Sequence, residues 1–342
     1  MKTIHITIVL LVVALTAVVA NAKEKGQINL FCWSEYVPQS VIDGFTKETG
    51  IKVNVENYAS NEEMISKLQA GAIQYDLIQP SEYIIERLVK AGKLEPIDFT
   101  NVPNFKNILP EFKNMPFDPE SKYSVVWMAG TVGIVVNTEV VKDEIKSFKD
   151  VFQPKFKGRI ITLDDAREMV GWALKTESLG INDITPQTLD KVKPILQSWI
   201  PLIKVYDSDS PKDKLLGGDV DLGIVWSGEA ALCFNEDKKF KYVLPLEGTH
   251  MFIDSLAIPK GSKNKANAEK FIDYVLRPEV SKIVSEEFPY TNPNGEARKL
   301  LSADQLGNPA SYPPKTTLEV FSDIGEAAEA VDKMVTDLKS AN

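Results

Sequence analysis

The feature that most constrains the fold is an alternation of short strand patterns and amphipathic helix patterns along most of the chain. Apolar and polar residues alternate at 51–56, as is typical of a half-buried strand. The preceding segment, 38–47, places Val41, Ile42 and Phe45 on one helical face. Strands separated by helices predict a parallel sheet with right-handed crossovers, so we expect an α/β protein.

Two series of this kind follow one another. In the first, strands are expected at 28–32, 51–55 and 76–78, with helices at 38–47, from 60 and at 83–90. In the second, strands are expected at 131–136, 159–163, 202–206, 222–225 and 252–258, with helices that include 164–178, 266–276, 279–286 and 325–338. Because no flexible linker separates the series, they predict two lobes joined by crossing strands, each with a mostly parallel sheet flanked by helices.

Residues 1–22 have the pattern of a secretory signal. Lys2 is followed by an apolar run at 6–19 and by the small-x-small sequence Ala20-Asn21-Ala22. The run is short for a membrane span, which needs about 20 apolar residues. We therefore expect cleavage near Ala22 and an exported protein, with an uncleaved anchor as the alternative.

Composition excludes several classes of function. The formal net charge of −9 disfavours nucleic acid and anionic membranes as partners. His5 lies in the signal segment, which leaves His250 alone for a triad or a zinc site, and no G-x-S-x-G or G-x-G-x-x-G motif is present. Cys32 and Cys233 are expected to be buried free thiols, with a disulfide between them as the alternative. We expect no catalytic residue, metal or cofactor.

Acidic and aromatic residues recur at the ends of the expected strands in both series. In open α/β sheets, ligands bind beyond the carboxyl ends of the strands, so two facing lobes would place these residues in the cleft between them. The candidates are Trp33, Ser34, Glu35, Tyr36, Ser81, Tyr83, Asp164, Asp165, Glu168, Ser208, Trp226, Asp254 and Tyr290.

Structural roles are the alternative for several of these candidates. Trp33 and Trp226 are the kind of residue that usually belongs to a core. One residue of the pair Asp164-Asp165 is expected to cap the following helix, and Asp164 is favoured. Asp254 is the hardest to explain structurally, because its neighbours are apolar and an unpaired buried charge is costly.

A structural role is also an alternative for the helix that follows Asp164-Asp165. Asp165 and Glu168 are three residues apart and share a helical face, so both could be solvated, with Arg167 as a structural partner.

Acids and rings without accompanying bases indicate an elongated, multiply charged organic cation as ligand. Carboxylates neutralise its ends, and each ring face adds about 0.5–2 kcal/mol of attraction. A diamine of this kind separates its ammonium groups by roughly 6 Å. A receptor for another small cation, or for a metal held by Tyr residues, is one alternative. An exported glycoside hydrolase that pairs Asp165 with Asp254 or Glu35 is another.

Several segments spread over nearly the whole chain form a further pattern. They are FCWSEYVP at 31–38, FTKETGIKV at 45–53, YDL at 75–77, PS at 80–81, LDDARE at 163–168, MFIDSLAIP at 251–259 and ARKLL at 297–301. This pattern resembles the periplasmic spermidine/putrescine-binding proteins of ABC transporters. The resemblance implies a two-lobed periplasmic-binding-protein fold with a polyamine, putrescine or spermidine, in the cleft between the lobes.

The resemblance also implies roles for individual residues. It implies that ammonium groups pair with Glu35, Asp165, Glu168 and Asp254, that aromatic walls are formed by Trp33, Tyr36, Trp226 and Tyr290, and that the site is lined or hydrogen-bonded by Ser34, Ser81, Tyr83 and Ser208. Two residues depart from the family. Phe252 stands where relatives carry Trp, and Phe321 falls where a spermidine-preferring relative carries Gln, which favours putrescine slightly.

The resemblance further implies how the protein is organised and what it contacts. Lobe I is expected at 23–130 and about 254–298, lobe II at 131–253 and about 299–342, with a hinge near 129–132 and 254–257. A monomeric periplasmic receptor that delivers its ligand to an ABC permease in the inner membrane is expected, with no nucleic acid partner.

Overall fold

The computed structural model describes residues 26–71, 74–314 and 317–341, so the expected secretory signal at 1–22 lies outside the described residues. Within the described ranges, no helix combines the length and the apolar character that crossing a bilayer requires.

The described strands form one connected sheet of mixed direction, in the order β2-β1-β3-β9-β4-β7-β5-β6, with β10 added on β9 and β8 on β4. Their bounds are β1 Gln27–Trp33, β2 Lys52–Tyr58, β3 Leu77–Ile78, β4 Ser124–Asn137, β5 Ile160–Thr162, β6 Ile203–Tyr206, β7 Leu222–Trp226, β8 Phe240–Val243, β9 Thr249–Ala257 and β10 Leu318–Glu319. Pairing of β1 with β2 and β3, and of β5 with β6 and β7, is parallel as predicted. β4 and β9 run antiparallel to each other and to β7 and β3, which the sequence patterns did not indicate.

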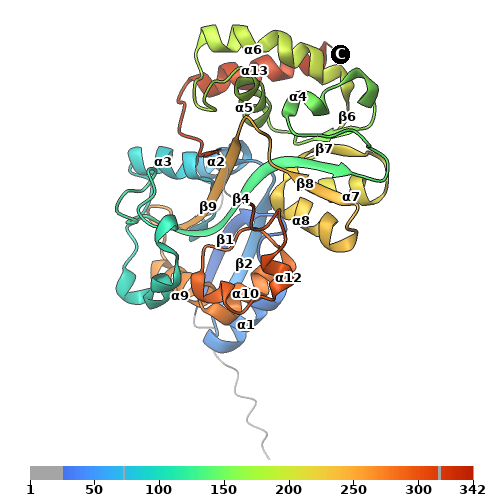
Figure 1. Cartoon of the computed structure of the whole chain (residues 1–342). Helices are drawn as coiled ribbons and strands as arrows, with labels where there is room; N and C mark the ends of the chain where they lie inside the picture. Colours follow the sequence, from blue (N-terminus) through green and yellow to red (C-terminus); the bar gives the residue numbers. More distant parts are fainter. Residues whose placement is uncertain (1–25, 72–73, 315–316, 342) are drawn as a thin grey trace, which may run out of the picture.

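Helices cover the two ends of this sheet. Their bounds are α1 Gln39–Thr49, α2 Asn61–Ala70, α3 Glu82–Lys90, α4 Phe148–Val151, α5 Ala166–Thr176, α6 Pro186–Trp199, α7 Pro211–Leu216, α8 Ser227–Glu236, α9 Lys265–Val275, α10 Pro278–Glu287, α11 Gly295–Arg298, α12 Ala303–Leu306 and α13 Ala327–Ser340. Short 3₁₀ helices lie at Phe99–Asn101, Pro103–Asn107, Pro110–Phe112, Pro154–Phe156 and Ile200–Leu202. The two ends define a first lobe, around β1, β2, α1, α9 and α10, and a second lobe, around β6, β7, α5, α6 and α13 (Figure 1).

The first lobe illustrates how the sequence pattern produces its elements. α1 buries Val41, Ile42 and Phe45, and it ends at Gly50, whose φ of 72° is the left-handed conformation that glycine adopts without strain. The chain then returns as β2, which pairs in parallel with β1. The helix and the strand both lie where the apolar spacing predicts them.

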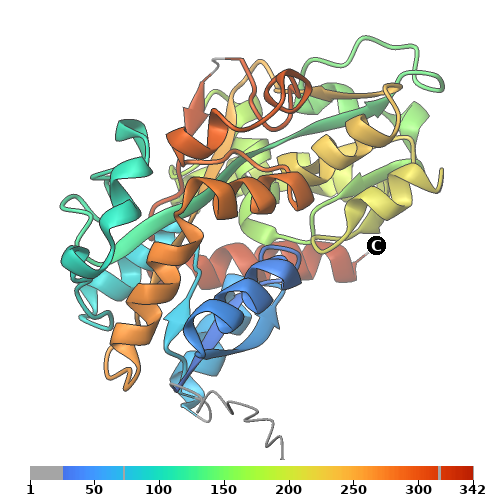
Figure 2. The ribbon, with the colours of Figure 1, turned by 90° about the horizontal axis from the view of Figure 1, so that it is seen from below.

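β4 joins the two lobes, and it is longer than predicted. It was expected to begin at Thr131, but it begins at Ser124, and all 14 of its residues are buried. The β-branched pattern that marks its second half is absent from 127–130, so the first half was missed. β4 pairs with β9 up to Thr131 and with β7 from Val132, and so passes from one lobe into the other (Figure 2).

Candidate functional site

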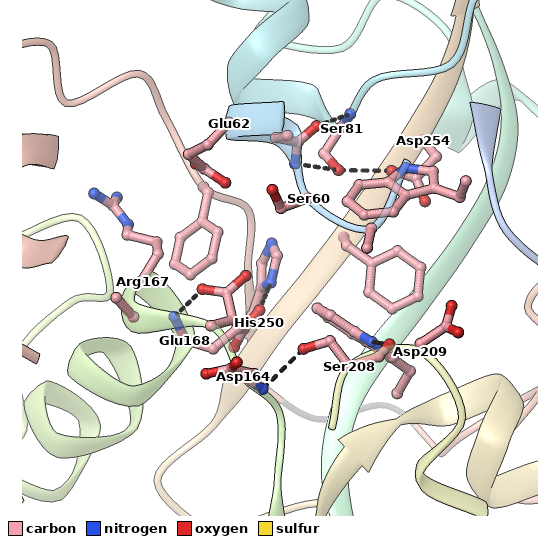
Figure 3. A pocket seen from close by; sticks show the side chains of 18 of the residues that line it. Ser60, Glu62, Ser81, Asp164, Arg167, Glu168, Ser208, Asp209, His250 and Asp254 are labelled. Carbon is pink, nitrogen blue, oxygen red and sulfur yellow. Dashed lines mark hydrogen bonds and ion pairs between the residues drawn. The ribbon is translucent and has the colours of Figure 1, made fainter. Parts of the chain in front are cut away.

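A cavity of about 320 Å³ lies between the two lobes. A volume of this size is within the range of small-molecule sites. Every residue that the sequence predicted for the ligand site lines it: Trp33, Ser34, Glu35, Tyr36, Ser81, Tyr83, Asp165, Glu168, Ser208, Trp226, Phe252, Asp254, Tyr290 and Phe321. In Figure 3, Ser81 and Asp254 lie on one side of this cavity and Asp164, Ser208 and Asp209 on the other.

The end of β1 supplies the first wall. Trp33 closes the strand and packs against Tyr58, with ring centroids 4.6 Å apart. Glu35 follows with a φ of 53°, a left-handed turn that ends the extended backbone. Ser34 donates a hydrogen bond to Asp209 of the second lobe. Trp33 is therefore only partly a core residue, and the turn points its neighbours across the cleft.

The start of α5 supplies the opposite wall, and here one prediction is wrong. Asp165, not Asp164, caps the helix, because its carboxylate accepts a hydrogen bond of 3.0 Å from the backbone N–H of Glu168. Asp164 is exposed and forms an ion pair with Lys339 of α13. The alternative of a solvated face is wrong for Glu168, which is 1% exposed.

Arg167 is not the ion-pair partner of these acids. Its Nη2 donates to Asn182 at 2.8 Å, and its guanidinium lies 4.6 Å from the centre of the Phe321 ring. Within the described parts of the chain, Arg167 has no ion pair with Asp165 or Glu168.

The crossing strand β9 contributes alternate side chains to the cavity. His250, Phe252 and Asp254 all line it, as residues two apart on a strand share one face. Asp254 is 2% exposed and accepts hydrogen bonds from Ser81 Oγ at 2.7 Å and from the Tyr36 hydroxyl at 2.9 Å. The first lobe thus fixes both carboxylate oxygens of Asp254.

Aromatic rings form a continuous wall through the cavity. Trp226 meets Phe252 edge to face at 5.3 Å, Phe252 meets Tyr290 at 5.8 Å, and Tyr290 meets Tyr36 at 5.3 Å between centroids. Trp226 is held by a hydrogen bond of 3.0 Å from its Nε1 to the carbonyl oxygen of Ser208. The wall ends beside the Asp254 carboxylate, because the Tyr36 hydroxyl contacts it.

The four carboxylates predicted to hold ammonium groups fall into two classes. Glu35 pairs with Lys212 at 2.8 Å, and Glu168 contacts His250. Asp165 and Asp254 have no Lys, Arg or His within ion-pair distance among the described residues. Two of the four predicted positions thus form no ion pair within the described ranges.

The unpaired carboxylates have unusual titration behaviour. Enclosure in the cavity raises the pKa of Asp165 to about 7, and the nearby charges of Glu168 and Glu62 act in the same direction. Burial also raises the pKa of Asp254 to about 7, although the hydrogen bonds from Ser81 and Tyr36 favour its ionised form. A cation that enters the cavity would therefore lower the pKa of both carboxylates and favour their ionised forms.

Sequence reasoning missed several polar residues of the cavity region. Lys212, which belongs to α7, bridges Glu35 and Glu229. His250 was considered only for catalysis, although its position two residues before Phe252 on a strand indicates the same face. Lys212 carried no such signal, because it reaches Glu35 from the opposite lobe. Other lining residues that were missed are Asn61, Glu62, Asp209, Asp332 and Lys339.

The cysteines and the final helix complete the environment. Cys32 and Cys233 are buried and free, as favoured.

α13 packs against α5 and lines the cavity with Asp332, Val335, Thr336 and Lys339, so the end of the described chain is part of the site.

Two α/β lobes around a cavity lined by rings and carboxylates define a small-molecule binding protein. The chain belongs to the bacterial extracellular solute-binding protein family, because the sequence model of that family matches residues 40–309.

Relatives with described ligands resemble nearly the whole chain. The spermidine/putrescine-binding periplasmic protein of Salmonella typhimurium is 37% identical over 94% of both chains, and that of Escherichia coli is 36% identical over the same shares. The putrescine-binding periplasmic protein PotF of Escherichia coli is 32% identical over 86% of this chain and 85% of its own length.

Solved structures agree with the observed fold. A structure from Listeria monocytogenes superposes with a TM-score of 0.89 at 31% identity and covers 92% of this chain and 99% of its own. The spermidine/putrescine ABC transporter substrate-binding protein PotD of Streptococcus pneumoniae has a TM-score of 0.79 at 31% identity, with the same coverage. The two-lobed periplasmic-binding-protein fold expected from the sequence is thereby confirmed.

Proposed function

We propose that the protein is an exported receptor that binds a polyamine in the cavity between its lobes and delivers it to an ABC importer. The observation that carries this proposal is the pair of carboxylates, Asp165 and Asp254, that line the cavity and have no ion pair with a Lys, Arg or His in the described part of the chain. A buried carboxylate is costly unless a positive charge compensates it, and an alkylammonium ligand supplies that charge.

The rings account for the rest of such a ligand. The methylene groups of a polyamine are apolar, and the wall formed by Trp226, Phe252, Tyr290 and Tyr36 covers apolar surface while its ring faces attract ammonium groups. The names of the relatives support the same ligand class. No covalent chemistry is required of any residue in this proposal.

Capture and release follow from the two-lobed architecture. In the proposed mechanism the lobes, at 23–130 with about 254–298 and at 131–253 with about 299–342, close over the ligand by bending at β4 and β9. β4 changes partner between Thr131 and Val132, and the residues of β9 opposite 129–131 are 251–253. We therefore place the hinge at 129–132 and 251–253, which moves its second half toward the start of β9.

The remaining parts of the proposal concern the cell. The relatives named as periplasmic proteins support a periplasmic location after removal of residues 1–22. The partner of the loaded receptor is then an ABC permease in the inner membrane, which the receptor meets as a monomer.

Titration calorimetry tests the proposed function. Purified protein is titrated with putrescine, cadaverine, spermidine and spermine, with glucose as an uncharged control. We expect saturable binding of at least one polyamine, and a ligand at one hundred times its Kd should stabilise the fold by about 2.7 kcal/mol. Absence of both heat and thermal stabilisation at millimolar concentrations of all four polyamines would refute the function.

A further inference from the structure

His250 is held between two buried carboxylates that come from different lobes. Its Nδ1 lies 2.5 Å from Glu168 Oε1 on α5, and its Nε2 lies 2.9 Å from Glu82 Oε1 on α3. The three side chains are 4%, 1% and 0% exposed, respectively, for His250, Glu168 and Glu82. Figure 3 shows His250 and Glu168 side by side in the cavity.

This arrangement fits a charged imidazole. A neutral imidazole has one N–H, so one of its nitrogens would face a carboxylate oxygen with lone pairs on both atoms, whereas an imidazolium donates to both. Burial disfavours the charged ring, but the charges and hydrogen bonds of Glu168 and Glu82 outweigh it and raise the pKa of His250 to about 10.

Protein groups engage both carboxylate oxygens of Glu168. Its Oε1 faces the imidazole, and its Oε2 accepts a hydrogen bond of 3.1 Å from Trp172 Nε1. Asp165 and Asp254 differ from Glu168 because no Lys, Arg or His of the described residues lies within ion-pair distance of them. Among the described residues, three other lining acids form no ion pair: Glu62, Asp209 and Asp332. They are exposed to solvent, where an ion pair contributes little.

Phe321 closes the same end of the cavity. Its ring stacks on His250 with centroids 3.8 Å apart and an interplanar angle of 29°, and the Arg167 guanidinium lies against it at 4.6 Å. A ligand ammonium directed toward Glu168 would therefore meet an aromatic ring and two positive charges. Like charges at such distances repel strongly in a partly dry site.

We propose that His250 determines specificity as a built-in cation: it occupies the ammonium position at Glu168 and restricts the ligand to a diamine held by Asp165 and Asp254. The inference rests on the proposed function and deepens it. It replaces the role that family resemblance implied for Glu168. It also gives Phe321 a second function, since the ring covers the imidazole that excludes a third ammonium group.

A double variant, Glu82→Gln with His250→Leu, tests the proposal. Removing His250 alone would leave two buried carboxylates facing each other. The Glu82→Gln change removes one of these charges, and its amide oxygen can still accept from the backbone N–H of Ile253, which Glu82 now binds at 2.9 Å. Calorimetry with putrescine and spermidine should show that the wild type prefers putrescine. In the double variant, the ratio of spermidine affinity to putrescine affinity should increase at least tenfold. In Glu82→Gln alone, the amide NH2 faces His250 Nε2, so a neutral imidazole can accept from it and still donate from Nδ1 to Glu168. This single variant keeps the ring but removes the second carboxylate that favours its charge, so its affinity ratio should also shift toward spermidine.

The wild-type protein provides a second test that needs no variant. His250 is the sole histidine outside residues 1–22, so its imidazole signals in NMR spectra of the processed chain need no assignment. We expect both ring nitrogens to stay protonated at pH 8. A neutral ring at pH 7 would refute the built-in cation.

The outcomes separate the inference from the function beneath it. If no polyamine binds the wild type, both are refuted. If polyamines bind but the wild type prefers spermidine, or the folded double variant keeps the wild-type ratio, the role of His250 is refuted and the receptor function stands.

Discussion

Replacing Asp254 by Asn should abolish most polyamine affinity without harming the fold. Asn has the same shape, and the hydroxyl groups of Ser81 and Tyr36, which now donate to Asp254 at 2.7 and 2.9 Å, are each able to donate or to accept. The variant therefore removes one negative charge from a side chain that is 2% exposed and leaves its hydrogen-bonding partners in place.

The expected loss follows from that burial. Removing one partner of a buried, hydrogen-bonded charge pair costs about 2–5 kcal/mol of binding free energy. At about 1.4 kcal/mol per factor of ten, the Kd should rise roughly 30- to 3,000-fold. The free energy of unfolding of the ligand-free protein, by contrast, should increase in the variant. Burial raises the pKa of Asp254 to about 7, so its ionised form destabilises the ligand-free fold above that pH, and Asn removes this cost.

Calorimetry and thermal unfolding at pH 8, each with and without putrescine, measure the two effects. Asp304→Asn, which removes an exposed acid on α12 outside the cavity, is the matched control and should behave as wild type. A folded Asp254→Asn protein that binds putrescine within threefold of the wild type would refute the placement of an ammonium group at this carboxylate.

Three further predictions concern protons and donors. Because Asp165 and Asp254 both have a pKa raised to about 7, diamine affinity should increase as the pH rises toward about 7. At pH 7 each carboxylate is about half protonated, so binding should release roughly one proton. Calorimetry in buffers of different ionisation heat detects this release. The pKa of His250 is raised from 6.5 to about 10, so the stabilising effect of the charged ring is complete below about pH 6.5 and is lost as the pH passes through 10. Denaturant titrations should therefore give a lower free energy of unfolding at pH 10 than at pH 7. Equal values would count against the buried imidazolium. Tyr36→Phe removes the hydroxyl donor to Asp254 and should weaken binding about tenfold, a loss of about 1–1.5 kcal/mol; unchanged affinity would show that this hydrogen bond does not orient the carboxylate.

The sequence predicted many of the residues that line the cavity, because the ends of strands can be recognised in it. Trp33, Ser81 and Trp226 each follow or close a short apolar run, and parallel strands bring such positions to one edge of a sheet. The periodicity of α1 and β2 likewise predicted both elements closely. These features depend on neighbours in the chain, and so they can be read locally.

Pairing between the lobes could not be read in this way. Glu35 and Lys212 are 177 residues apart, and no local pattern indicates that they meet. The same limit applies to the contact between Glu168 and His250, which spans 82 residues. The choice of Asp165 over Asp164 as helix cap depended on a single residue of register, which propensity alone does not decide.

The polar contacts that join the lobes beside the cavity bear on how long a ligand stays bound. Ser34 contacts Asp209 and Glu35 contacts Lys212, and in each pair at least one side chain is exposed to solvent. A ligand that leaves by separation of the lobes must wait for both contacts to break. Added salt weakens the second of them, because Glu35 is exposed and salt reduces the attraction between charges near water. Because this pair of contacts adds to the barrier for lobe separation, the residence time of the ligand should shorten as salt is added, even where Asp165 and Asp254 still bind the ligand.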